Sequence, residues 1–187
     1  LFRLLEKSWR HFFHRQKLPF LVVQLSSLNR SSWPEFRDSQ RRLSAKLPET
    51  WLIVTSDLGD SLDVHYRNKQ PVGERLALQA LHHVYEHHLV SEGPTCIKAR
   101  AVDNLVYLYF ENAHGLQAKG GAVQGFEVAG EDGVYYAAKA EIEGESVIVT
   151  SDKVPNPRAV RYGWQPFTRA NLINSASLPC STFKKKI

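Results

Sequence analysis

The best candidates for chemistry in this 187-residue chain lie in one polar segment, residues 56–69. It holds three aspartates and one histidine: Asp57, Asp60, Asp63 and His65. A histidine can take a proton from a serine hydroxyl when a carboxylate fixes its tautomer and stabilises its charged form. Either Asp63 or Asp60 could be that carboxylate. The same aspartates could instead cap the helix that follows, and spacing alone does not choose between the two roles.

Two strands and three helices are expected to position this segment. The continuous apolar runs at 19–25 and 51–55 are typical of strands buried on both faces of a parallel sheet. Apolar residues recur at helical spacing over 1–16 and over 71–89. Ser32 and Glu35 have the spacing of a capping box, and Pro34 fits the first turn of a third helix, which is predicted to end near residue 46.

The alternation of helix and strand predicts half of an open α/β domain over residues 1–92. Reactive groups collect beyond the carboxyl ends of the strands in such sheets. Residues 56–69 follow the second predicted strand and therefore occupy such a position.

The pattern changes after Gly93 and Pro94, and residues 93–187 are predicted to form a β-sandwich domain. Short β-rich runs separated by Gly, Asp and Asn turns indicate this fold: 105–111, 123–128, 134–142, 146–150 and 159–164.

Composition excludes some classes of function. Lys and Arg number 24 against 19 Asp and Glu, but the basic residues are scattered, and the run at 184–186 is expected to be a solvated tail, so no nucleic-acid partner is predicted. No apolar run approaches the roughly 20 residues of a membrane helix. Cys96 and Cys180 permit one disulfide but form no closely spaced metal pair.

The chain opens on an amphipathic segment rather than on an initiator methionine or a signal peptide. We therefore expect an upstream part of the same protein to be its partner.

The residues from Asp57 to Ala77 resemble the histidine-bearing block of sialate O-acetylesterases, a family of carbohydrate acetylesterases in the SGNH hydrolase superfamily. The resemblance covers nearly the whole chain in order. It continues through these residues: Pro19-Phe20-Leu21, Gln24-Leu25, Glu92-Gly93-Pro94, Gly115-Leu116, Gly125-Phe126-Glu127, Arg161-Tyr162-Gly163-Trp164, Ala170-Asn171-Leu172 and Leu178-Pro179. It implies that residues 1–92 are the C-terminal half of an SGNH-type three-layer α/β domain.

The resemblance assigns His65 as the general base. It implies hydrolysis of acetyl esters on sugar hydroxyls by a Ser-His-Asp mechanism, without a metal or other cofactor. Two positions depart from the family pattern: Leu62 stands where the superfamily often has its acid, and Tyr66 where family members commonly have proline. The first candidate for the group that orients His65 is therefore Asp63, the second is Asp60, and the third is a backbone carbonyl.

The nucleophilic serine is expected on the missing upstream part, so this chain alone should be inactive. Residues 144–146, Gly-Glu-Ser, resemble a Gly-x-Ser nucleophile motif, but they follow the histidine and are interpreted as a β-turn.

Other candidates have structural alternatives. His83 and His87 have the i,i+4 spacing of a metal pair, but no third ligand is evident and a solvated helix face is favoured. Residues 67–69 could contact a glycan, or serve the start of the next helix with Asn68 as its cap. Trp164, Tyr135 and Tyr136 could stack on sugars, although aromatic residues in strands are more often core.

Two hypotheses remain. The first is a secreted or periplasmic carbohydrate esterase acting on an acetylated glycan, as the resemblance implies. The second is a non-catalytic carbohydrate-binding module, which the β-rich half and the absent serine would fit.

Overall fold

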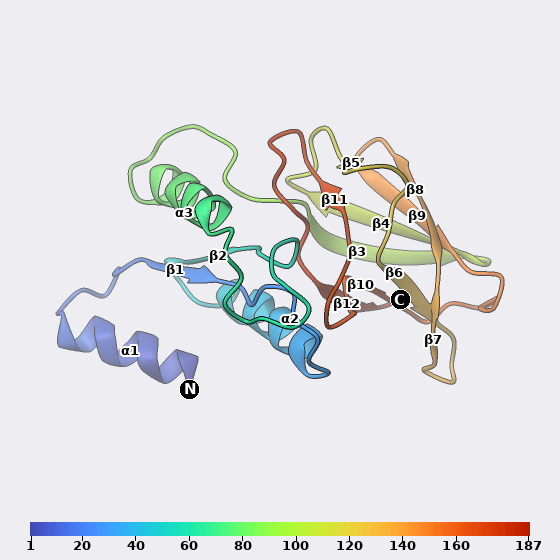
Figure 1. The fold of residues 1–187 in the computed structure, drawn as a ribbon, viewed down its shortest axis with the longest axis horizontal. Helices are drawn as coiled ribbons and strands as arrows, with labels where there is room; N and C mark the ends of the chain where they lie inside the picture. Colours follow the sequence, from blue (N-terminus) through green and yellow to red (C-terminus); the bar gives the residue numbers. More distant parts are fainter.

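The computed structural model describes residues 1–187 as three α-helices and twelve β-strands. The helices and two of the strands lie at one end of the molecule, and the remaining strands form sheets at the other end (Figure 1).

The first end is built from α1 (Phe2–Phe12), β1 (Phe20–Val23), α2 (Trp33–Ser44), β2 (Thr50–Ile53) and α3 (Gln70–His83). β1 and β2 pair in parallel, with Phe20 opposite Thr50. The alternation of helix and strand and the parallel pairing agree with the sequence prediction.

Several boundaries and environments differ from the prediction. α3 ends at His83 and not near residue 89. Ser32 lies at the N-cap of α2 but makes no side-chain capping hydrogen bond, so the predicted capping box does not form. The residues of β1 are half-buried or exposed rather than buried on both faces, and the sheet has only two strands.

The second end contains two four-stranded antiparallel sheets, in the orders β12-β10-β6-β7 and β3-β4-β9-β8. A short antiparallel pair joins β11 to β5. The strands are β3 (Thr95–Val102), β4 (Leu105–Glu111), β5 (Gln117–Ala118), β6 (Phe126–Ala129), β7 (Tyr135–Ala137), β8 (Lys139–Glu143), β9 (Ser146–Thr150), β10 (Ala159–Tyr162), β11 (Leu172–Ile173) and β12 (Phe183–Lys186).

One hydrophobic core lies between the two larger sheets. Val106 and Val149 enter it from β4 and β9, and Val128, Val160 and Phe183 enter it from β6, β10 and β12. All five are almost completely buried. Burial of alternate residues in β4 and β9 explains why these two segments were recognisable as strands from the sequence.

The lysine run is a strand and not a solvated tail. Phe183 is buried, the β12 backbone pairs with β10, and the lysine side chains occupy exposed or half-buried positions. Pairing of the backbone sets this segment's structure, and the side chains of Lys184 and Lys186 remain exposed on the face opposite Phe183. β3 was also not predicted from the sequence, because small and charged residues fill most of its accessible positions.

The two ends of the molecule meet through Arg37 of α2, which is completely buried. Its guanidinium donates hydrogen bonds to the carbonyl oxygens of Gly163, Gln165 and Pro166 at 2.9, 2.6 and 2.9 Å, and to the hydroxyl of Thr182 at 3.0 Å. Burial lowers the pKa of Arg37 to about 10. The residues after β10 thus return to the helical end, and a domain boundary at 92/93 stays a prediction.

Cys96 and Cys180 are buried free thiols. None of the three helices combines the length and apolar character that crossing a membrane requires.

Candidate functional site

The histidine segment leaves the sheet at the carboxyl end of β2 and returns to the body of the protein at α3. Its first residues are attached to the segment that follows β1. The Thr55 hydroxyl donates to the carbonyl oxygen of Gln24, and the Ser27 hydroxyl donates to that of Ser56 at 2.5 Å. The Ser27 amide donates to the carbonyl oxygen of Leu58 at 2.8 Å. The carboxyl ends of both parallel strands are therefore joined, as open α/β sheets predict.

Gly59 allows this close approach. Its φ is +119°, and a Cβ at this position would lie 2.2 Å from the carbonyl oxygen of Ser27. Only glycine tolerates both conditions.

Arg75 ties the segment to α3. Its guanidinium donates two hydrogen bonds to the Asp57 carboxylate, at 2.7 and 2.6 Å, and another to the carbonyl oxygen of Val54 at 2.7 Å. A two-pronged arginine–carboxylate pair fixes orientation as well as position. Asp57 is thereby committed to Arg75 and not to a histidine.

The other two aspartates bind backbone amides. Asp60 accepts hydrogen bonds from the amides of Leu62 and Asp63 at 2.8 and 3.2 Å, and the first of these is the larger cause of the lowered pKa of Asp60. Asp63 accepts a hydrogen bond from the backbone amide of His65 at 2.7 Å. Both carboxylates therefore shape the turn that presents His65.

His65 is exposed, and its imidazole takes part in no hydrogen bond within the chain. Leu62 and Val64 beside it are also exposed. On its other side Tyr66 is half-buried, with the Lys69 ammonium 3.4 Å from its ring centre. Burial, and then the nearby Asp57 charge, raise the pKa of Tyr66.

The structure thus brings Asp57, Asp60, Asp63 and His65 into one loop at a strand's carboxyl end, where sequence reasoning expected them. A hydrogen bond between the His65 ring and either Asp63 or Asp60 stays a prediction. Asp63 contacts the backbone of His65 and not its ring. The contacts of Arg75 with Asp57 and of Ser27 with Ser56 were not predicted from the sequence. The only sequence signal for Arg75 is an arginine at a position that the amphipathic pattern of the helix predicts to be buried.

The remaining candidates lie elsewhere. Gly144 has a φ of +61° in the tight turn between β8 and β9, which confirms the turn interpretation of residues 144–146. Lys69, not Asn68, lies at the N-cap of α3, and no side chain caps it. Tyr136 packs against the core, as expected, whereas Trp164 and Tyr135 lie outside it beside Arg161 and Lys184.

His83 and His87, which have the spacing of a metal pair in the sequence, do not lie on one helix. α3 ends at His83, and His82 Nδ1 contacts the carbonyl oxygen of His87 at 3.0 Å beyond that end. His83 is not on a solvated face either: its ring stacks on Trp51 with centroids 4.4 Å apart, and it lies 3.4 Å from Glu92. No group of three or more His, Cys, Asp or Glu side chains is placed to hold a metal ion.

The chain is similar to the solved structure of XAC1771, described as a novel carbohydrate acetylesterase from Xanthomonas citri. The two share 41% sequence identity and superpose with a TM-score of 0.91. The match covers 96% of this chain and 43% of that one, so the chain spans less than half the length of its structural relative. No family model and no curated protein matches the chain.

Proposed function

We propose that this chain is the histidine-bearing part of a carbohydrate O-acetylesterase of the sialate O-acetylesterase type. The similarity to XAC1771 over 96% of the chain carries the proposal. An identity of 41% at a TM-score of 0.91 is higher than two proteins that share only a fold would have. The substrate is an acetyl ester on a sugar hydroxyl, and the setting is secreted or periplasmic.

In the proposed mechanism, a serine outside these 187 residues attacks the acetyl carbonyl. His65 takes the serine proton and returns it to the departing sugar oxygen, leaving an acyl-enzyme. Water activated by His65 then releases acetate and restores the serine. The loop supports this role because it leaves the imidazole exposed and without a competing hydrogen bond.

Asp63 is the first candidate to orient the imidazole, with Asp60 as the alternative. A rotation of the Asp63 side chain would be needed, because its carboxylate now accepts from the His65 amide. Hydrogen bonds at catalytic sites commonly tighten only when substrate is bound.

Exposed apolar side chains support the proposal that further polypeptide completes the site. On α1 and at its C-terminal end, Leu4, Trp9, Phe12 and Phe13 are 48% exposed or more, and Leu62 in the histidine loop is 88% exposed. One edge of β1 is also unpaired. An apolar surface beside an open parallel sheet edge is suited to cover by more of an α/β domain.

The test is acetate release from a panel of acetylated glycans by the full-length protein and its His65→Ala variant. The variant should lose activity by on the order of 10³-fold or more, since triad members act as a unit. Its melting temperature should stay near that of the unmodified protein, because His65 is exposed and contributes no packing.

Asp63→Asn and Asp60→Asn, made separately, identify the acid. The variant with the larger fall in kcat marks the orienting carboxylate, and equal small effects would favour a backbone carbonyl. Full activity of His65→Ala would overturn the proposed mechanism.

A further inference from the structure

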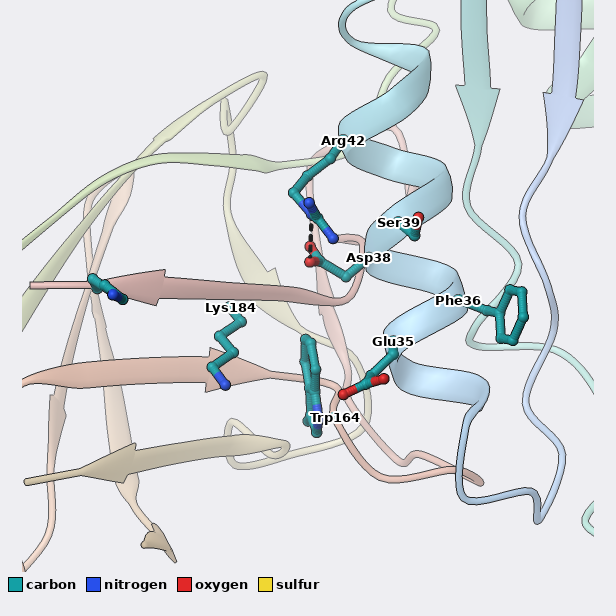
Figure 2. A pocket seen from close by; sticks show the side chains of 8 residues that line it. Glu35, Phe36, Asp38, Ser39, Arg42, Trp164 and Lys184 are labelled. Carbon is teal, nitrogen blue, oxygen red and sulfur yellow. Dashed lines mark hydrogen bonds and ion pairs between the residues drawn. The ribbon is translucent and has the colours of Figure 1, made fainter. Parts of the chain in front are cut away.

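A groove runs between α2 and the outer face of the sheet that contains β12, and no residue of the histidine loop lines it. Its cavity volume is about 650 Å³. The polar and aromatic side chains that line it include Glu35, Asp38, Ser39, Arg42, Trp164 and Lys184. Figure 2 shows Trp164 standing between Lys184 of β12 and Glu35 of α2.

Trp164 is half-buried and lies outside the hydrophobic core. The guanidinium of Arg161 and the ammonium of Lys184 lie 5.9 and 5.8 Å from its ring centre. The same two cations lie 4.0 and 5.2 Å from the ring centre of Tyr135. The two aromatic rings and the two cations therefore lie side by side at the surface of the protein. Two aromatic rings packed in the core would have no such charged neighbours.

The charges of the groove are unequally neutralised. Within the groove, Asp38 is held by Arg41 and Arg42 at 2.6 and 2.8 Å; beside it, Arg161 is held by Glu127 at 2.9 Å. Lys184 and Lys186 form no ion pair, although both line the groove. They are two residues apart on one strand, so they lie on the same face about 7 Å from each other.

We propose that this groove binds a saccharide that carries a carboxylate, with Trp164 against the sugar ring and Lys184 and Lys186 at the carboxylate. An indole face stacks on the apolar face of a ring, and a pair of unneutralised ammonium groups attracts an anion. Glu35 accepts hydrogen bonds from sugar hydroxyls. The groove is a binding site separate from His65 and does not depend on the proposed reaction.

A saccharide fits these side chains better than a nucleic acid does. Sugar hydroxyls both donate and accept hydrogen bonds, so they suit a groove lined by both the acceptor Glu35 and the donor Lys184. A nucleic-acid strand needs a track of cations for successive phosphates, and Glu35 and Asp38 would interrupt it.

The test is calorimetric titration of the full-length protein with two acidic saccharides, trigalacturonic acid and 3′-sialyllactose. Each is compared with its neutral counterpart, carboxyl-reduced trigalacturonic acid or lactose. The proposal expects at least one acidic saccharide to bind about tenfold or more tightly than its counterpart, and the more tightly bound one identifies the source of the carboxylate. Raising the salt concentration should weaken that binding.

Trp164→Ala, Lys184→Gln and Lys186→Gln should each weaken binding of that saccharide about tenfold or more. Phe167→Ala, an exposed aromatic outside the groove, and Lys139→Gln, an exposed lysine on β8, are the matched controls and should bind normally. The two lysine variants keep the test valid if Trp164→Ala does not fold, because Lys184 and Lys186 are exposed.

His65→Ala should bind the acidic saccharide as the unmodified protein does, which separates this site from the proposed esterase site. The proposal is overturned if neither acidic saccharide binds better than its neutral counterpart, if the groove variants bind normally, or if His65→Ala abolishes binding. Tighter binding of a single-stranded oligothymidylate through the same residues would also overturn it.

Discussion

Arg75 and Asp57 form a two-pronged ion pair, with hydrogen bonds of 2.7 and 2.6 Å, between α3 and the loop that carries His65. The two side chains are only 11% and 24% exposed. Such a partly buried pair is stronger and better oriented than an exposed one. Arg75 also holds the carbonyl oxygen of Val54, so a single side chain fixes both the end of β2 and the start of the loop.

We expect Arg75→Gln in the full-length protein to lower kcat for acetate release about tenfold or more. Arg75 acts as a positioning residue, so the loss should appear in kcat with a smaller change in KM. Arg75→Lys should restore only part of the lost kcat, because an ammonium group cannot make the two-pronged contact of a guanidinium. Glu74→Gln, next to it on α3 and exposed, is the control. An unchanged kcat in Arg75→Gln would show that the pair does not position the site.

Replacing Arg37 should destabilise the whole protein. Arg37→Ala removes the guanidinium that donates to three carbonyl oxygens and opens a cavity, which we expect to cost about 3 kcal/mol or more. For a chain of this size the melting temperature should fall by roughly 6–12 °C. Thermal unfolding followed by circular dichroism checks this, with the exposed Arg169→Ala as control. Equal melting temperatures for the two variants would contradict a role for Arg37 in joining the two ends.

His83 makes stability depend on pH. Burial against Trp51 is the main cause that lowers its pKa below 6.5, and Glu92 opposes that effect. The unfolded chain therefore binds a proton more readily than the folded chain, and stability should fall as the pH drops below about 6.5 through the lowered folded pKa.

Urea unfolding between pH 7.5 and 5 measures this dependence. In His83→Gln the loss of stability over that range should be smaller than in the unmodified protein. His88→Gln, which changes an exposed histidine, should leave the pH dependence unaltered. A steeper dependence in His83→Gln would reverse the assigned direction of the pKa shift.

Both cysteines should resist alkylation while the protein is folded. Burial raises the pKa of the Cys96 thiol to about 11 and raises that of Cys180 as well, so very little reactive thiolate exists at pH 8. Mass spectrometry after iodoacetamide treatment should find both thiols unmodified in the native protein and modified in guanidinium. Rapid labelling of the native protein would contradict this prediction, because it would show that the surroundings of the thiols open to solvent.

Local patterns predicted much of the architecture. Helical periodicity located α1 and α3, capping-box spacing with Pro34 located α2, and short β-rich runs between turn residues located β4 and β9 with their observed bounds. These succeeded because burial of one face imposes a period on the sequence. The patterns failed for β3 and β12, whose charged residues lie on accessible positions, and for the end of α3, where the chain leaves the helix after His83.

The sequence by itself determined that the aspartates and His65 share a loop after a strand, since that depends only on their order along the chain and on the position of β2. Only the tertiary structure decided what each group contacts. Asp57 is bound by Arg75, eighteen residues away, and the Trp164 groove joins α2 to β12 across well over a hundred residues. Hydrogen bonds and grooves between distant segments follow from how the elements pack, and packing leaves no periodic signal in the sequence.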